Sequence, residues 1–283
     1  MRVLHRPRRM RIPALSTRRS GLLLLLALVA PVPGTAQADP MTEPGPLLDR
    51  GDAWAAAAFV AAGFAMLPFD GAIAAEIQDS LFQELPGFRQ TATAFKFLGF
   101  PGSVIIGGGL YGAGRIFDNG DMADVGLHVT EAILVAEAMT YTVKLLAGRA
   151  RPSLDVAEPY DFRFARGFRG EDWQALPSGH TTAAFATAGA SARELSRLWP
   201  GHDLLVGVLT YGPAALVGAS RMFDNRHWAS DVVFGAAIGS VTGWALVEYN
   251  HDRPGNRVDR VFLTVSAPPG RLTDVRLGIA FGR

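Results

Sequence analysis

The sequence has no cysteine and comparatively few charged residues. Without cysteine, the 283-residue chain can form no disulfide and offers no thiolate as a nucleophile or metal ligand. Charged residues are 19% of the chain and hydrophobic residues 49%, so a sizeable core is available. Long uncharged runs are also lacking, because those at 97–114, 204–219 and 232–247 fall short of the ~20 residues of a typical membrane-spanning helix. The sequence therefore predicts a soluble or membrane-surface body.

The first 38 residues have the three-part pattern of a secretory signal peptide. Residues 1–20 hold seven arginines and no acidic residue, an apolar run follows at 21–32, and Ala36-Gln37-Ala38 is a small-residue cleavage site. A short membrane anchor is the alternative, which the brevity of the apolar run disfavours. The pattern predicts export to the periplasm, with the inner membrane as the alternative location, and it leaves Sec and twin-arginine export open.

The positive charge of the chain is concentrated in that N-terminal segment. The whole chain has 27 Lys+Arg and 26 Asp+Glu, and its formal net charge is +1. Without the seven N-terminal arginines, 20 basic residues face 26 acidic ones, a net charge of −6. A general nucleic-acid binder needs a basic surface, so the net charge argues against this function class.

After a proline-rich linker at 39–51, the pattern predicts a helical domain at 52–252 and a C-terminal extension at 257–283. In the extension, Val275, Leu277, Ile279 and Phe281 alternate after a Pro-Pro-Gly turn, which predicts a short β-hairpin. The fold class is therefore all-α, a helical bundle with a terminal hairpin. Helices are expected near 52–67, 71–84, 89–98, 121–149, 179–197, 203–220 and 228–250.

The first motif with chemical potential is a pair of cations, Lys144 and Arg151, followed by Pro152. On a helix their spacing of seven places both on one face, and the proline ends the helix. Two long cationic side chains that reach a common point can clamp an anion. Taken alone, the pair is more typical of an ordinary basic helix end, which the helix dipole favours.

The second motif, Pro177-Ser178-Gly179-His180, precedes an apolar run that reads as a helix. Ser178 is a good N-cap, and free backbone N–H groups at a helix start bind phosphate well. His180 would lie beside such an anion, in place to protonate a leaving oxygen. A simple cap with a surface histidine explains the motif equally well.

The third motif combines Ser220-Arg221 with His227 and Asp231. His227 and Asp231 are four residues apart, so they share one side of a helix. A carboxylate on one ring nitrogen fixes the tautomer and leaves the other nitrogen free as a nucleophile. Arg221 could fork onto phosphate oxygens. A single pair of this kind is by default a helix-surface ion pair.

Together the motifs supply three cations, two histidines and one carboxylate in an order that suits phosphoryl transfer. In this combination the sequence resembles the superfamily of type-2 phosphatidic acid phosphatases and vanadium haloperoxidases, which includes bacterial non-specific acid phosphatases. The resemblance covers all three signature motifs without a gap, from residue 144 to 231, and the helical body at 52–250 fits the all-α bundle of that family. A chance match of all three motifs is far less expected than a match of one.

The resemblance implies a role for each motif residue. His227 would attack phosphorus and carry the phosphoryl group, Asp231 would orient His227, and His180 would act first as general acid and then as general base. No metal ligand and no cofactor is implied. The phosphate oxygens would be held by the remaining motif residues, which are Lys144, Arg151, Arg221, Ser178 and Gly179.

Several functions stay open at this point. The leading one is a periplasmic, metal-independent hydrolase that acts on phosphate monoesters of small molecules or lipids. The first alternative is a membrane-bound phosphatase of lipid phosphates or isoprenyl diphosphates. A vanadium-dependent haloperoxidase, the one alternative with a cofactor (vanadate), fits less well because the chain is short for that group. The intact histidines oppose a non-enzymatic scaffold. The natural substrate and the oligomeric state are not encoded in a readable pattern.

Three further features attract attention. Residues 153–176 interleave five aromatic residues with three arginines, which suits a lid or a surface for lipid headgroups, although a loop packed by its own aromatics is the simpler interpretation. Gly107-x-Gly109-x-x-Gly112 matches a dinucleotide fingerprint but lacks the βαβ context, so we interpret it as close helix packing. The other internal histidines, His128, His202 and His251, show no partner pattern.

Overall fold

The computed structural model of the chain describes residues 48–79, 83–84, 87–253, 264–265 and 277–278. The predicted signal peptide at 1–38 lies outside these residues, as does most of the predicted linker at 39–51. Both stay predictions, together with the division of the chain into domains.

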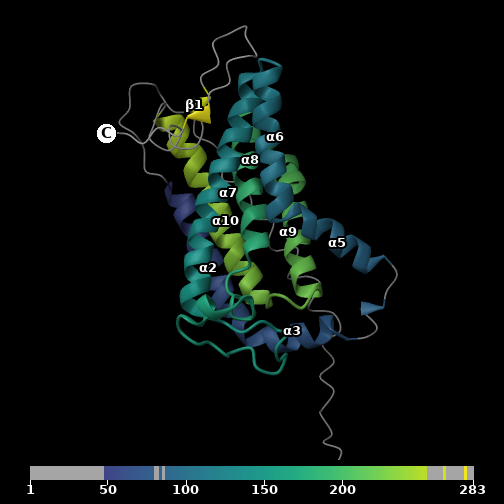
Figure 1. The fold of residues 1–283 in the computed structure, drawn as a ribbon. Coiled ribbons are helices and arrows are strands. Elements are labelled where there is room, and N and C mark those ends of the chain that lie inside the picture. Colours follow the sequence, from purple (N-terminus) through teal and green to yellow (C-terminus); the bar gives the residue numbers. More distant parts are fainter. Residues whose placement is uncertain (1–47, 80–82, 85–86, 254–263, 266–276, 279–283) are drawn as a thin grey trace, which may run out of the picture.

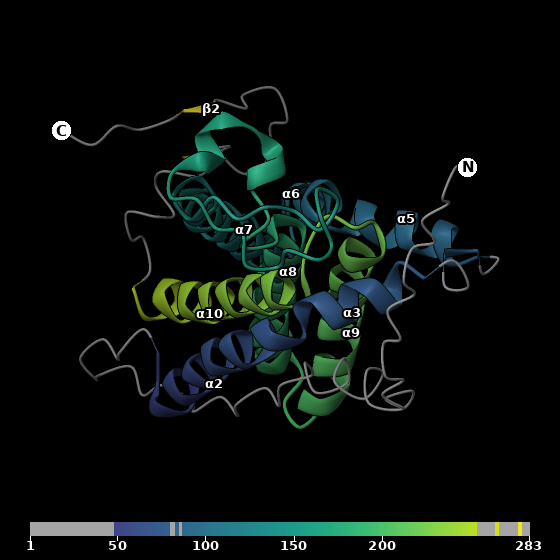
Figure 2. The same ribbon diagram turned by 90° about the horizontal axis from the view of Figure 1, so that it is seen from below.

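The described chain is a bundle of α-helices, which confirms the predicted all-α class. The helices are α2 (Arg50–Met66), α3 (Asp70–Ile77), α5 (Phe88–Leu98), α6 (Phe100–Ile116), α7 (Gly120–Ala147), α8 (Gly179–Leu198), α9 (Asp203–Phe223) and α10 (Ala229–Asp252). Figure 1 shows α7, α8 and α10 upright in the middle, α3 across the lower end and α5 leaving the bundle sideways. In the view along the bundle, α10 lies between α2 and the pair α7 and α8 (Figure 2).

Helices α8 and α10 run in the same direction and touch through glycine. A Cβ added at Gly235 would lie 2.6 Å from the carbonyl oxygen of Ser178, and one at Gly243 would lie 2.7 Å from the amide nitrogen of Ala190. From Gly235 to Gly243 along α10, the contacts on α8 advance from Ser178 to Ala190. Both helices therefore run in the same direction. The consequence for function is that both helices begin at the same end of the bundle.

Helix α6 occupies a stretch for which the sequence predicts no helix. Its glycine content argues against a helix by propensity, but Pro101 falls in the first turn, where proline is tolerated. A Cβ at Gly107 would meet the Oγ1 of Thr130 at 2.6 Å, so this glycine lets α6 approach α7 closely. At Gly109 and Gly112 a Cβ would meet no described atom within 4 Å, so the packing interpretation holds only for Gly107.

The predicted C-terminal hairpin is not supported. Strands β1 (Thr264–Val265) and β2 (Leu277–Gly278) pair antiparallel over two residues each. The rest of the segment at 257–283 lies outside the described residues, so the hairpin stays a prediction.

Three helical stretches are long and apolar enough to cross a membrane: Arg50–Ile77, Asp203–Phe223 and Ala229–Asp252. The pair α5 and α6, bent by 49°, is a fourth candidate if it counts as one span. These lengths correct the expectation that no stretch is long enough. The expectation counted only uncharged runs, which end at the first charged residue, whereas the helices continue past such residues. Asp52, for example, is buried in an ion pair with Arg193 inside the bundle.

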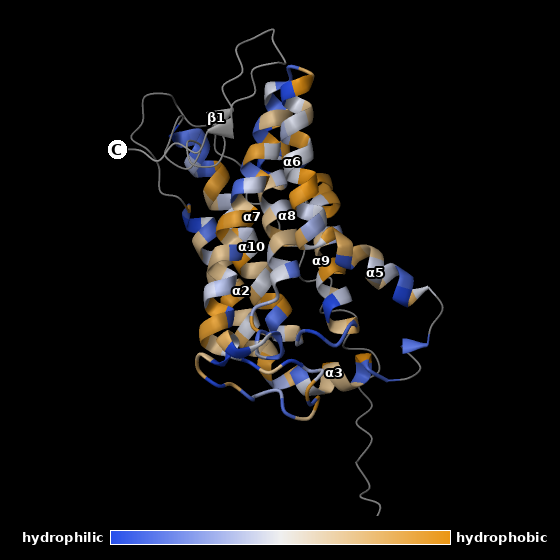
Figure 3. Ribbon diagram, in the orientation of Figure 1, coloured by the Kyte–Doolittle hydropathy of each residue, from blue (hydrophilic) through white to orange (hydrophobic). Residues whose placement is uncertain are grey.

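The outside of the bundle is apolar as well. Figure 3 shows hydrophobic residues along the upright helices, while hydrophilic residues gather in the loops at the lower end. On α9, Leu204 is 79% exposed and Leu209 62% exposed. Monomeric soluble proteins rarely expose apolar patches of this extent, so this surface is suited to lipid or to a protein partner. Large exposed apolar side chains also occur on α2, α6 and α7, among them Trp54, Phe64, Ile105, Ile116 and Met139.

Candidate active site

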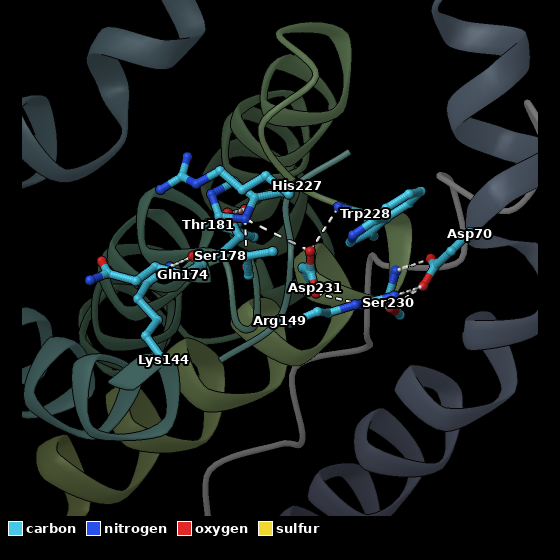
Figure 4. Close-up of polar contacts among 12 residues, drawn as sticks. Asp70, Lys144, Arg149, Gln174, Ser178, Thr181, His227, Trp228, Ser230 and Asp231 are labelled. Carbon is cyan, nitrogen blue, oxygen red and sulfur yellow. Dashed lines mark hydrogen bonds and ion pairs between the residues drawn. The ribbon is translucent and has the colours of Figure 1, made fainter. Parts of the chain in front are cut away.

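The three sequence motifs meet at the lower end of the bundle in Figure 1. Because α8 and α10 both begin there, His180 in the first turn of α8 and His227 just before α10 come to the same end. Helix α7 runs the opposite way and brings Lys144, in its last turn, to that end too. Figure 4 shows Lys144, Ser178 and His227 around one region, with Asp231 on the side of His227 away from Lys144.

His227 is buried and held in a single tautomer. Its Nδ1 lies 2.6 Å from the carbonyl oxygen of Ala175. Because a carbonyl only accepts, Nδ1 must carry the proton, and the lone pair is on Nε2. Burial, followed by the positive charges of Lys144, Arg151 and Arg221, lowers the pKa of His227 well below its ordinary value. The ring is therefore neutral at neutral pH and has a nucleophilic nitrogen.

Asp231 lies too far from His227 for the predicted hydrogen bond. Its Oδ2 is 3.9 Å from Nδ1 of His227 and accepts a hydrogen bond from the backbone N–H of Trp228 at 2.8 Å instead. Its Oδ1 accepts from Nη1 of Arg149 at 2.6 Å (Figure 4). In the first turn of α10, Asp231 thus caps the helix, and the carbonyl of Ala175 fixes the imidazole.

Sequence reasoning missed the buried network behind Asp231. Arg149 is fully buried and also donates to Oδ2 of Asp70 at 2.7 Å and to the hydroxyl of Ser230 at 2.7 Å. Asp70 in turn accepts from the N–H and hydroxyl of Ser230. No spacing rule links Arg149 to Asp70. The available signal was Asp70 itself, an isolated acid directly after the apolar stretch 53–69.

The three motif cations are each anchored by one contact. Lys144 donates from Nζ to the carbonyl of Gln174 at 2.9 Å. Arg151 donates from Nε to the carbonyl of Glu171 at 2.6 Å, and Arg221 donates from Nη1 to Asp224 at 2.9 Å. The Nε of Arg221 is buried and has no hydrogen-bond partner among the residues that the structure describes. Each cation thus keeps donors for an anion.

His180 lies in reach of the same charges. Burial is the largest of the effects that lower its pKa to about 4, and the positive charges of Arg221, Lys96, Lys144 and Arg151 contribute in that order. The same three motif cations thus lower the pKa of both imidazoles, which indicates that these five groups lie near one another. A bound phosphate dianion would offset these positive charges and raise the pKa of His180 again, which favours the protonated form that a general acid requires.

Ser178 and Gly179 form the start of α8. Ser178 occupies the N-cap position, but its side chain makes no capping hydrogen bond; its Oγ accepts from the hydroxyl of Thr181 at 2.8 Å. A Cβ at Gly179 would lie 3.2 Å from Oε2 of Glu137 and 3.6 Å from Cε of Lys144. The absent side chain at Gly179 therefore leaves room for the carboxylate of Glu137, while Lys144 would be at ordinary contact distance beside the helix N-terminus.

Gly99, between α5 and α6, leaves room for the ring of His180. A Cβ at this position would lie 2.6 Å from Cδ2 and 2.9 Å from Cβ of His180, distances that force the histidine to move. We expect Gly99→Ala to lower kcat at least about tenfold, because misplacing a catalytic group by a fraction of an ångström costs orders of magnitude. Gly108→Ala, on the next helix, is the matched control, since a Cβ there meets no described atom within 4 Å. Equal kcat in the two variants would contradict a role of Gly99 in placing His180.

The segment 153–176 between the first two motifs packs partly by itself and partly leaves its aromatics outside. Arg163 and Arg166 lie over the ring of Trp173 at 4.6 and 4.7 Å. Phe164 is 84% exposed and Phe168 65% exposed. The simple interpretation of a self-packed loop therefore holds for Trp173, while the exposed phenylalanines beside arginines suit a lipid interface.

Comparison with known proteins agrees with this site. Residues 126–254 match the model of the PAP2 superfamily, and this range includes all three motifs. The lipid A 1-phosphatase of Porphyromonas gingivalis is 45% identical over 67 residues, which are 24% of this chain and 14% of that protein. The chain thus spans about one seventh of the length of this curated relative.

A solved structure shares the fold. It is described as the first transmembrane PAP2 type phosphatidylglycerolphosphate phosphatase from Bacillus subtilis. The two chains superpose with a TM-score of 0.51 at 22% sequence identity, over 71% of this chain and 94% of the other. At this identity the similarity establishes the helical architecture.

Proposed function

We propose that this chain, a member of the PAP2 superfamily, is a membrane-embedded hydrolase of phosphoric ester bonds that acts on lipid phosphates through a phosphohistidine intermediate at His227. One observation carries the proposal. The half-buried imidazole of His180 and the buried imidazole of His227, both neutral at neutral pH, lie near three partly unsatisfied cations at the end of a bundle whose outside is apolar. Such a site accepts a phosphate from a molecule whose remainder stays in the lipid.

In the first step, Nε2 of His227 attacks phosphorus in line with the leaving oxygen. A nitrogen–phosphorus bond forms while the bond from phosphorus to the ester oxygen breaks, and His180 donates its proton to that oxygen. Lys144, Arg151 and Arg221 hold the equatorial oxygens, where charge accumulates. The carbonyl of Ala175 stabilises the positive ring, because Nδ1–H becomes a stronger donor once Nε2 carries the phosphoryl group.

In the second step, the now neutral His180 takes a proton from water, and the water oxygen attacks phosphorus. The nitrogen–phosphorus bond breaks, and His227 returns to its neutral tautomer as inorganic phosphate leaves. The same cations hold the phosphate throughout. Every group that these steps use belongs to the three motifs or to the backbone.

Three observations support a lipid rather than a free sugar or nucleotide phosphate as the substrate. The candidate spans provide a membrane location, and the exposed phenylalanines and arginines of 153–176 lie at the end that holds the site. Both named relatives are phosphatases of phosphorylated lipids by their descriptions. A soluble periplasmic enzyme, the function that the sequence alone favours, lacks such support.

Membrane fractionation combined with an assay in chelator tests the proposal. We expect the full chain to sediment with membranes, to resist extraction by carbonate and to release phosphate from a phosphorylated lipid in mixed micelles with EDTA present. Vanadate, a phosphate analogue, should inhibit. Release by osmotic shock with equal activity on a water-soluble ester would instead favour the soluble phosphatase. Peroxide-dependent halide oxidation after vanadate loading would favour the haloperoxidase.

A further inference from the structure

A second group of polar residues lies at the opposite end of the same three helices. His128 on α7, Glu194 on α8 and His251 on α10 present one nitrogen or oxygen each, and these atoms all lie within 4.8 Å of one another. Glu194 lies 14 residues beyond His180 on α8, which at 1.5 Å per residue is about 21 Å from the catalytic end. No step of the proposed reaction uses this group.

We propose that His128, Glu194 and His251 form a binding site for a zinc-class divalent cation that joins α7, α8 and α10. Two imidazole nitrogens and one carboxylate oxygen are a common ligand set for Zn²⁺, which accepts such donors in tetrahedral geometry. The three ligands come from three different helices, so a bound ion cross-links the bundle. The inference does not depend on the proposed phosphatase reaction.

The present distances are those of a hydrogen-bonded form that needs little movement to bind a metal. Nδ1 of His128 is 2.6 Å from Oε1 of Glu194, and Nε2 of His251 is 2.8 Å from the same oxygen. In a tetrahedral site with bonds of about 2.0–2.1 Å, ligand atoms lie about 3.3 Å apart. Each nitrogen must therefore move from the oxygen by less than about 1 Å, and the two nitrogens, which lie within 4.8 Å of each other, must approach by at most about 1.5 Å; both shifts are within the reach of side-chain rotation.

Burial and charge also suit a cation. His128 and Glu194 are buried, while the side chain of His251 is 38% exposed and leaves a path for an ion and for a water as fourth ligand. Asp124 lies one turn before His128 on α7, and Glu131 lies three residues after it, so two further carboxylates contribute negative charge to this end.

The neighbouring contact supports a fixed geometry. Asn250, next to His251, donates from Nδ2 to Oε2 of Glu131 at 2.6 Å. Glu131 is three residues from His128, so this hydrogen bond holds α10 against α7 directly beside the proposed ligands. The rings of His128 and His251 already lie 5.4 Å apart in an edge-to-face arrangement. The ligands are thus held on rigid helices, which favours a defined metal site.

Metal titration of the untagged full chain in detergent tests this site. After treatment with chelator, we expect about one equivalent of Zn²⁺ to bind per chain and to raise Tm by at least about 5 °C at a hundredfold excess over Kd. Co²⁺ in its place should give the visible absorption of a tetrahedral complex. His251→Ala and Glu194→Gln should each bind less than a tenth of an equivalent and show no shift in Tm.

His202→Ala is the matched control, because His202 is an exposed histidine in the turn before α9 and should leave binding unchanged. Phosphate release, measured about 20 Å from the site, reports that each variant is folded. Absence of stoichiometric Zn²⁺ binding by the wild type would overturn the proposal. So would retention of that binding in both ligand variants, which would leave the three side chains as a purely hydrogen-bonded group.

Discussion

His227→Ala is expected to lower the rate of phosphate-ester hydrolysis by at least about 10⁴-fold, because it removes the nitrogen that is proposed to carry the phosphoryl group. Loss of a covalent nucleophile has effects of this size in other hydrolases, where the residual rate reflects binding and electrostatics alone. His227 contributes a single buried hydrogen bond to Ala175, so the variant should remain folded. Phosphate release from a lipid phosphate in micelles, with EDTA present, measures the loss.

A trapping experiment separates the nucleophile from the acid–base histidine. With a substrate whose leaving group needs no protonation, such as a nitrophenyl phosphate, His180→Gln should form the phosphohistidine but hydrolyse it slowly. Radiolabel should then accumulate on the chain as an acid-labile adduct in His180→Gln and be missing in His227→Ala. His202→Ala, an exposed-histidine control, should behave as the wild type. Full activity of His227→Ala, or label that persists in it, would refute the phosphohistidine mechanism.

The motifs made the site predictable because their residues lie close to helix starts and ends. Ser178 and His180 begin α8, His227 precedes α10 and Lys144 ends α7. Residue type, spacing and the family resemblance together predicted that these four side chains belong to one site, and the structure brings them to one end of the bundle. The all-α class followed equally well from the apolar periodicity.

Contacts between segments distant in the sequence were not predictable. The carbonyl of Ala175 orients His227, although any residue type at 175 would offer the same oxygen, so no sequence signal exists for it. Arg149 reaches Asp70 across 79 positions, and such pairs become visible only once the helices pack. The spanning candidates were missed for a related reason: charges such as Asp52 interrupt an uncharged run but are neutralised inside the bundle by partners on other helices.

Arg149→Met is expected to lower the free energy of unfolding by about 3–5 kcal/mol, the cost of leaving buried charges without their partner. Arg149 satisfies Asp231 at 2.6 Å and Asp70 at 2.7 Å, and its guanidinium lies over the ring of Trp228 at 5.4 Å. Methionine retains most of the volume but none of the donors, so both carboxylates lose a charged hydrogen bond. The shift of the denaturant midpoint in detergent measures the effect.

Arg163→Met is the matched control for this prediction. Arg163 also pairs with an aspartate, Asp161 at 3.0 Å, and lies over an aromatic ring, but its side chain is 54% exposed. Solvent screens such a pair, so the control should lose less than about 1 kcal/mol. Equal losses of unfolding free energy in the two variants would show that the buried Arg149 network stabilises the fold no more than an exposed ion pair does. A larger loss for Arg149→Met, with a parallel fall in kcat, would show that this network fixes the first turn of α10 and thereby the position of His227.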